Sequence, residues 1–218
     1  MNFLWIIPCY AAGIADDLKY LTEAVNSVKA QTDIDWHLLI VDDCSPNASV
    51  MDYICNTCNT DHRISCMRVA ATGGVANARN LVVRWAQSMG YDVVLFLDTD
   101  DIASRNRLAD VRRIMTDNPD VCLVYSDFVV IDENTKPWKL KDIVPDLRQI
   151  NNGHPKEECK FEDIWIDIVT SLGYTNLTST TSMRTKYIAE NPFLEDAFVS
   201  EDYYAWLTAS AAGCTYYF

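Results

Sequence analysis

Short apolar runs alternate with segments of helical periodicity along the first 126 residues of the chain. Each run is four to six residues long, which suits a buried strand, whereas the segments between them carry apolar residues three or four positions apart. The predicted strands are 4–7, 37–41, 64–69, 93–97 and 121–126, and the predicted helices are 17–30, 48–58, 75–89 and 105–117. This β–α repeat predicts an α/β fold with a mainly parallel central sheet and helices on both faces.

The pattern loosens between residues 132 and 176, where prolines and glycines are spread through a stretch of mixed charge. We predict that this stretch is an insertion with one helix near 161–172, and that it lies over the ligand site. Beyond it, residues 178–183 are predicted to form a strand and residues 201–212 a final helix.

The balance of charge is strongly acidic, because 31 Asp and Glu residues face 18 Lys and Arg residues. The resulting net charge of −13 repels a polyanion, so no nucleic-acid partner is expected. A small phosphorylated ligand is compatible with this charge if a cation or a well-placed arginine neutralises its phosphates locally.

No apolar run reaches the length that a membrane span needs, so no integral membrane segment is expected. The run at residues 3–7 stops at Pro8 and has no basic residues before it, which favours a buried strand over a signal peptide. Without an export signal the expected location is cytoplasmic, and the eight cysteines are then expected to be reduced.

One group of thiols has loop lengths near those of a small zinc knuckle without matching them: Cys55, Cys58, His62 and Cys66. We predict ordinary thiols on a helix, a turn and a strand rather than a metal site.

Asp98 and Asp100 directly follow the apolar strand predicted at 93–97. Residues two apart on an extended chain point to the same side, so the two carboxylates are expected to converge, which is unfavourable unless a cation joins them. Hard oxygen ligands suit Mg²⁺ or Mn²⁺. The alternative is a solvated acidic loop in which Asp101 or Ser104 caps the next helix.

Five segments in order resemble glycosyltransferase family 2, which has the GT-A fold; they are residues 6–10, 40–45, 73–80, 98–101 and 200–207. The resemblance implies one catalytic domain over 1–218, with a nucleotide-sugar-binding half at about 1–130 and an acceptor-side half at about 131–218. The domain could be part of a longer protein.

The resemblance also implies roles for the residues at the ends of the first strands and on the helix after them. Pro8 and Tyr10 would belong to the nucleotide-sugar site, with Tyr10 near the nucleotide base and its ring able to stack on it. Asp43 would accept a hydrogen bond from the uracil N–H, with Asp42 as the substitute. The alternatives are ordinary packing for Tyr10 and a capped turn for the two acids.

Gly74 would let the backbone pass close to the ligand, and Arg79 would offer its charge to the diphosphate, a surface ion pair being the alternative for Arg79. Asp98 would contact both the ribose and the metal. Asp100 would be the surer metal ligand, with Asp101 as a possible substitute.

Asp202 is the candidate general base, since an acceptor hydroxyl needs to lose its proton as it attacks. The alternative is that Asp202 and Glu201 are simply two acids in the first turn of a helix. His154 lies inside the loosened stretch, whereas some family members carry a metal-binding His after the final acidic pair.

The sequence thus predicts a metal-dependent, inverting glycosyltransferase that uses a UDP-sugar, Mn²⁺ or Mg²⁺, and a hydroxyl acceptor on a glycan, lipid or protein. A retaining outcome stays open. The other candidates are a nucleotide-sugar-binding module without turnover and a sugar-1-phosphate nucleotidyltransferase. The latter is disfavoured because residues 8–13 lack the glycine-rich phosphate loop expected after the first strand.

Overall fold

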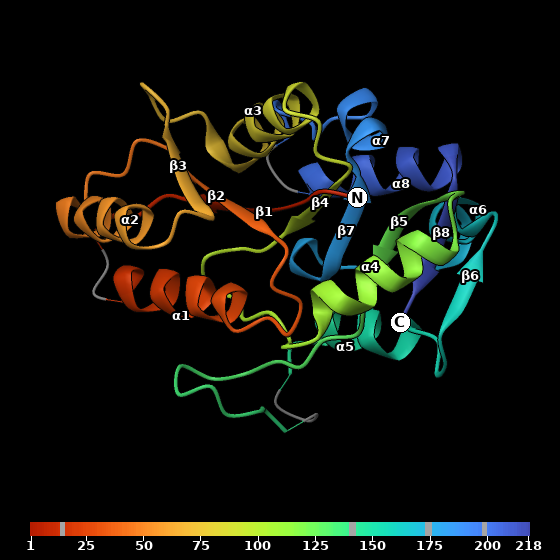
Figure 1. Cartoon of the computed structure of the whole chain (residues 1–218). Coiled ribbons are helices and arrows are strands. Elements are labelled where there is room, and N and C mark those ends of the chain that lie inside the picture. Colours follow the sequence, from red (N-terminus) through yellow and green to blue (C-terminus); the bar gives the residue numbers. More distant parts are fainter. Residues whose placement is uncertain (14–15, 140–142, 173–175, 198–199) are drawn as a thin grey trace.

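The computed structural model describes residues 1–218 apart from 14–15, 140–142, 173–175 and 198–199, and it shows one eight-stranded sheet covered by helices (Figure 1). The strands are β1 (Phe3–Cys9), β2 (His37–Asp42), β3 (Ile64–Arg68), β4 (Val93–Phe96), β5 (Val121–Tyr125), β6 (Cys159–Phe161), β7 (Thr181–Arg184) and β8 (Cys214–Tyr217). The α-helices are α1 (Asp17–Lys29), α2 (Ala48–Thr60), α3 (Gly74–Ser88), α4 (Arg107–Asp117), α5 (Pro145–Gly153), α6 (Ile164–Asp167), α7 (Thr185–Glu190) and α8 (Glu201–Ala212). A π-helical segment, η2 (Ile168–Leu172), and a 3₁₀ turn, η3 (Thr178–Thr180), complete them.

The strands lie in the order β3-β2-β1-β4-β7-β5-β8-β6, and four of the seven neighbouring pairs are parallel. β7 is antiparallel to both β4 and β5, so β5 runs in the same direction as β1 to β4. The carboxyl ends of β1, β2, β4 and β5 therefore meet at one edge of the sheet, where ligands of such folds collect.

The central strand β1 is completely buried, and its side chains alternate between two apolar cores. Phe3, Trp5 and Ile7 pack with residues of α1, α2 and α4 on one face. Leu4 and Ile6 pack with residues of α3, α7 and α8 on the other. The prediction of a mainly parallel sheet covered on both faces is confirmed (Figure 1).

The predicted elements of the first 126 residues agree with the structure to within about two residues at each end. The later part is less regular than predicted. The helix expected near 161–172 is a short α6 that continues as η2, and the strand expected at 178–183 begins as η3 before β7. α5, β6, α7 and β8 were not predicted; each of them is short.

None of the helices in the described parts of the chain is both long and apolar enough to cross a membrane.

Arg107, the first residue of α4, joins the end of β4 to the segment that leads into β7. Its guanidinium is buried and donates hydrogen bonds to the carbonyl oxygens of Phe96, Ser179 and Thr181, the last at 2.8 Å. Burial lowers the pKa of Arg107 to about 9, although the Asp101 carboxylate acts in the opposite direction. The Arg107 side chain therefore satisfies three backbone carbonyl oxygens close to the acids at residues 98–101.

Replacing Arg107 by Met should lower the free energy of unfolding by about 2–4 kcal/mol, because buried carbonyl oxygens lose their donors. Urea denaturation measures the change. Arg105→Met is the matched control, since Arg105 lies two residues earlier and is exposed. Equal stability of the two variants would contradict the role given to Arg107.

Candidate active site

A cavity of about 350 Å³ opens at the carboxyl ends of β1, β2 and β4. Six of the residues predicted for the ligand site line it: Pro8, Tyr10, Asp43, Arg79, Asp98 and Asp100. These residues are dispersed over more than ninety positions of the sequence, and the parallel topology brings them together. Gly74 and Asp202 do not belong to the lining.

Asp43 is buried and fixed in orientation by the start of α3. Its two carboxylate oxygens accept hydrogen bonds from the backbone N–H groups of Gly73, at 2.9 Å, and Gly74, at 2.8 Å. Gly74 has a φ of +84°, a conformation that favours glycine. The observed contact of Gly74 is thus with Asp43, and Gly74 helps to aim the Asp43 carboxylate.

Asp42 is directed away from this cavity, although it is adjacent to Asp43. Its carboxylate forms a 2.8 Å ion pair with Arg68 and accepts a hydrogen bond from the backbone N–H of Ser45. Only Asp43 of the two acids lines the cavity. This arrangement favours Asp43 over Asp42 as the residue that could form a hydrogen bond with a ligand in this cavity.

Tyr10 follows the last residue of β1 and remains 53% exposed. Pro8 is buried within β1 and pairs with Val41 of β2. The Tyr10 ring is therefore not used for core packing and is accessible at the cavity.

Arg79 lies on α3 and is only 3% exposed. Its Nη2 donates to Asp98 Oδ1 at 2.6 Å, and its Nη1 donates to Glu201 Oε1 at 2.8 Å. Burial acts to lower the pKa of Arg79, but the neighbouring carboxylates, Asp98 first, outweigh it and raise the pKa. The ion pair is thus buried, not the surface pair considered as an alternative, and it connects α3 with the end of β4 and the start of α8.

Asp98 and Asp100 keep carboxylate oxygens available. Asp98 uses Oδ1 for Arg79, and its backbone N–H donates to Ser179 Oγ, whereas Asp98 Oδ2 and both Asp100 oxygens have no hydrogen-bond partner among the described residues. Loss of water around its carboxyl group, together with the charges of Asp98 and Asp100, raises the pKa of Asp101 to about 6. The residue as a whole is nevertheless exposed to solvent.

These oxygens fit a hard divalent cation that keeps water and phosphate as its other ligands. Outside the omitted positions, the chain has no group of three or more His, Cys, Asp or Glu side chains arranged to hold a metal by themselves. Cys55, Cys58 and Cys66 form no disulfide within the described structure, and their role as ordinary thiols stays a prediction.

Asp202 lies in the first turn of α8 and is 7% exposed. Thr178 Oγ1 donates to Asp202 Oδ2 at 2.6 Å, and Asp202 Oδ1 has no hydrogen-bond partner within the described part of the chain. Glu201, the preceding residue, points to Arg79, so the two acids diverge as expected for neighbours on a helix.

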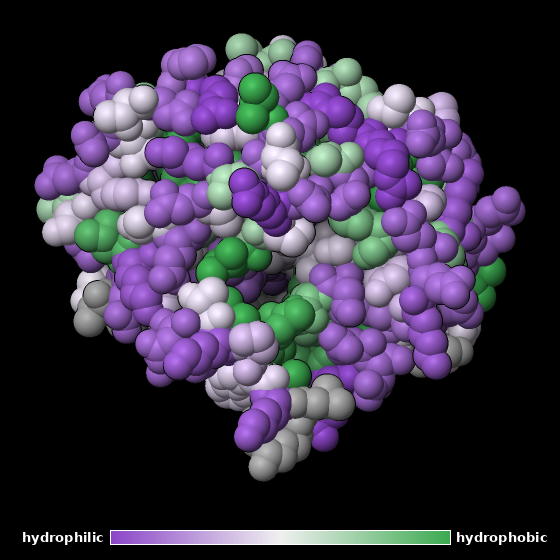
Figure 2. Space-filling model, turned by 60° about the horizontal axis from the view of Figure 1, so that its bottom comes forward, coloured by the Kyte–Doolittle hydropathy of each residue, from purple (hydrophilic) through white to green (hydrophobic). Residues whose placement is uncertain are grey.

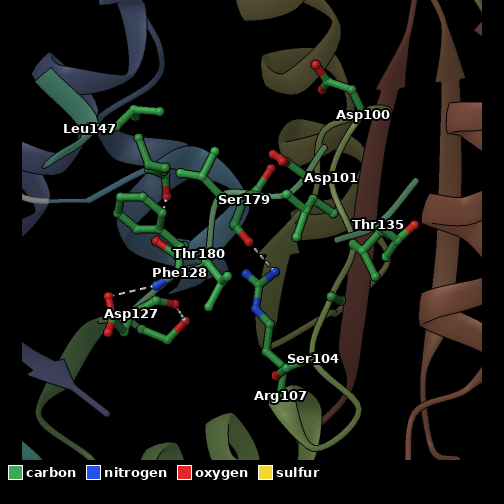
Figure 3. Close-up of a pocket in the computed structure, with 17 residues that line it drawn as sticks. Asp100, Asp101, Ser104, Arg107, Asp127, Phe128, Thr135, Leu147, Ser179 and Thr180 are labelled. Atoms are coloured by element: carbon green, nitrogen blue, oxygen red, sulfur yellow. Dashed lines mark hydrogen bonds between the residues drawn. The ribbon is translucent and has the colours of Figure 1, made fainter. Parts of the chain in front are cut away.

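Figure 3 shows the residues that line a larger cavity of about 610 Å³. Asp100 lines both cavities, so the two adjoin. The walls of the larger cavity are residues 100–104 and Arg107, residues 126–131, Thr135, Leu147 of α5, and residues 177–180 without Thr178. Figure 2 shows a hollow bordered by apolar side chains on the side where α5 and the segment after β5 lie. The predicted insertion therefore contributes to a cavity wall.

Asp127 lines this larger cavity and was not predicted from the sequence (Figure 3). Asp127 comes two residues after the buried strand β5, just as Asp98 comes two residues after β4. Asp127 shares with Asp98 the position just past a buried strand, and that part of the signal could have identified it, although no second acid follows at residue 129.

Comparison with known proteins identifies the family. The profile described as Glycosyl transferase family 2 matches residues 4–175. A relative is the Escherichia coli UDP-Glc:alpha-D-GlcNAc-diphosphoundecaprenol beta-1,3-glucosyltransferase WfgD, 26% identical over 191 residues, or 86% of this chain and 63% of WfgD.

Two solved structures share the fold. S. aureus TarS in complex with UDP-GlcNAc has a TM-score of 0.71 at 20% identity, covering 100% of this chain and 58% of TarS. The mannosyltransferase PcManGT from Pyrobaculum calidifontis, in complex with GDP-Man and Mn2+, has a TM-score of 0.64 at 14% identity, covering 98% of this chain and 53% of the mannosyltransferase. The chain thus spans between about half and two thirds of these proteins.

The double ion pair of Arg79 generates a stability prediction. Arg79→Lys should lower the free energy of unfolding by about 1–3 kcal/mol, because one ammonium group cannot replace the fork that reaches both Asp98 and Glu201. Arg84→Lys on the same helix is the control, since Arg84 is 58% exposed and should change stability by less than about 0.5 kcal/mol. Urea unfolding compares them, and similar values would show that the bridge is not stabilising.

Proposed function

The chain belongs to glycosyltransferase family 2, and from this premise we propose that it transfers a sugar from a UDP-sugar to a hydroxyl group of an acceptor. The observation that carries the proposal is the smaller cavity, which combines an accessible aromatic ring, an oriented buried carboxylate and a pair of acids with open oxygens. The UDP-Glc in the name of WfgD and the UDP-GlcNAc bound to TarS support a uridine nucleotide as the donor.

The nucleoside would bind between Tyr10 and Asp43. A base can stack on the exposed Tyr10 ring, and Asp43 can accept a hydrogen bond from the uracil N–H. Because the N–H groups of Gly73 and Gly74 hold Asp43, its carboxylate does not have to be reoriented when the base arrives.

The diphosphate would bind beside Asp98 and Asp100. Asp98 Oδ2 suits a ribose hydroxyl or a metal ligand, while Arg79 fixes the other Asp98 oxygen. A divalent cation, Mn²⁺ or Mg²⁺, held by Asp100 and Asp98 would neutralise the diphosphate and stabilise the departing nucleoside diphosphate. The Mn2+ bound to the mannosyltransferase supports this proposal.

Asp202 would act as the general base. It would accept the acceptor hydroxyl proton while that oxygen forms a bond to the anomeric carbon and the bond to the diphosphate breaks, which inverts the anomeric carbon. The Thr178 hydroxyl holds one oxygen of Asp202 and leaves the other for the acceptor. A nucleotide-sugar-binding module without turnover is the second candidate, since Asp202 is largely buried in this structure.

Metal dependence is tested at Asp100. We expect wild-type protein with Mn²⁺ to bind UDP-glucose or UDP-N-acetylglucosamine, and EDTA to weaken that binding at least tenfold. Asp100→Asn should remove most of the response to Mn²⁺, because a neutral amide is a poor metal ligand. Isothermal titration calorimetry measures both, with the exposed residue Asp117→Asn as the control. A full Mn²⁺ response in Asp100→Asn would reject Asp100 as a ligand.

The role of Asp202 is tested by comparing binding with turnover. Asp202→Asn should reduce UDP release in the transfer reaction by about 100-fold or more and change the Kd for the UDP-sugar less than threefold. Asp196→Asn, an exposed acid in the segment before α8, is the control. Undiminished turnover in Asp202→Asn would exclude it as the base. Wild-type protein that binds UDP-sugar without any turnover would favour the binding module.

A further inference from the structure

Asp127 lies on the wall of the larger cavity, and the function of this residue is not covered by the donor site described above (Figure 3). We infer that Asp127 binds a sugar hydroxyl in this cavity and that His154 is the positioning residue that holds its carboxylate. The inference rests on the proposed glycosyl transfer. The shared chemistry is a ring hydroxyl, which belongs either to the transferred sugar or to an acceptor sugar.

The hydrogen bonds of Asp127 are concentrated on one oxygen. Asp127 Oδ1 accepts from Phe128 N at 2.8 Å and Asn151 Nδ2 at 3.1 Å, and His154 Nδ1 lies 3.1 Å away. Oδ2 has no hydrogen-bond partner among the residues that the structure describes, and the Asp127 side chain is 56% exposed. One oxygen is therefore fixed, and the other is available to accept a hydrogen bond from a ligand.

His154 is held more tightly than a surface histidine. Its side chain is only 4% exposed, and its ring contacts the rings of Tyr125, Phe128 and Tyr217 with centroid distances of 5.6, 5.9 and 5.4 Å. These aromatic rings come from β5, the segment after it and β8. Their contacts with the imidazole restrict the orientation of its plane. Nδ1 must donate in its contact with Asp127, so the imidazole directs the carboxylate in the way that an outer partner orients a ligand-binding group.

The charge of the cavity indicates which ligand Asp127 can bind. Asp100 and Asp101 line the same cavity as Asp127, so a phosphate group that no cation accompanies would be repelled there. The buried Arg107 has no spare Nη group to donate to a phosphate, because its Nη atoms donate to backbone carbonyl oxygens. A neutral hydroxyl that donates to a carboxylate fits, and Phe128 and Leu147 supply apolar surface in the same cavity for the carbon atoms of a sugar ring.

Because Asp100 lines both cavities, it indicates which part of the substrates would occupy the larger one. A diphosphate at Asp100 would have the nucleoside on the side of the smaller cavity, and the larger cavity would then receive the sugar and the acceptor. Asp127 reaches this space from the end of β5 rather than from the nucleotide-binding strands. It is thus suited to select the sugars and not the nucleotide.

Asp127→Asn tests the inference, with Asp120→Asn as a matched control. Asp120 lies at the other end of β5, is 55% exposed and also has one basic partner, Lys160. Calorimetry with Mn²⁺ gives the Kd for UDP, UDP-glucose and UDP-N-acetylglucosamine. Initial rates with the better donor and a panel of methyl glycosides give the KM for donor and acceptor.

Asp127→Asn should weaken the binding of one sugar about tenfold or more and leave the Kd for UDP unchanged, because the amide nitrogen cannot accept a hydroxyl hydrogen bond. Weaker UDP-sugar binding identifies the transferred sugar as the source of the hydroxyl, and a raised acceptor KM alone identifies the acceptor sugar. Unchanged constants, or equal weakening of UDP itself, would overturn the inference. Wild-type protein that binds no UDP-sugar would overturn both the inference and the proposed function.

Two variants of His154 separate positioning from simple packing. His154→Phe keeps an aromatic ring but removes the donor, and it should reproduce the change in sugar affinity of Asp127→Asn. His154→Asn keeps a side-chain N–H donor and should restore part of that affinity. Loss of stability in His154→Phe, measured by urea unfolding, with a wild-type KM for both substrates would reduce His154 to a packing residue and overturn its role.

Discussion

The site depends on the two ion pairs of the buried Arg79 guanidinium. A buried charge is costly unless it is paired, and Arg79 is paired on two sides, with Asp98 and Glu201. The three residues come from α3, the end of β4 and the start of α8, so the pairing can form only when these distant segments are packed together. The position of Asp98 in the cavity is therefore a consequence of the whole fold.

The antiparallel strand β7 has a similar consequence for the larger cavity. It separates β4 from β5 yet leaves both pointing the same way, so Asp98 and Asp127 reach the same edge from strands that are not neighbours. The larger cavity is lined in part by η3. The buried Arg107 connects η3 to the end of β4 through hydrogen bonds to both. One reversed strand and one buried arginine thus place the larger cavity beside the smaller one.

The sequence predicted the first half of the fold because buried parallel strands and amphipathic helices leave strong periodic patterns. It also predicted that the residues after these strands lie together at one edge, since the topology of a parallel sheet determines where the strand ends meet. It could not predict that Arg79 pairs with Glu201, a residue 122 positions away, because nothing local records that contact. The short elements after residue 132 are stabilised by neighbours distant in sequence, and the aromatic surroundings of His154 depend on β8, which the sequence analysis did not predict.

The pairing of Arg79 also changes the charge balance of the proposed reaction. The sequence suggested that Arg79 offers its charge to a diphosphate, but in the structure two carboxylates use that charge. Arg107, the other buried arginine of the described cavity walls, is directed at carbonyl oxygens. A diphosphate would therefore meet Asp98 and Asp100 with little local positive charge, which is unfavourable unless a cation enters with it. The same acids would then favour nucleotide binding with a cation and oppose it without one, so the proposed cation requirement rests on how the arginines are paired and not only on the spacing of the two acids.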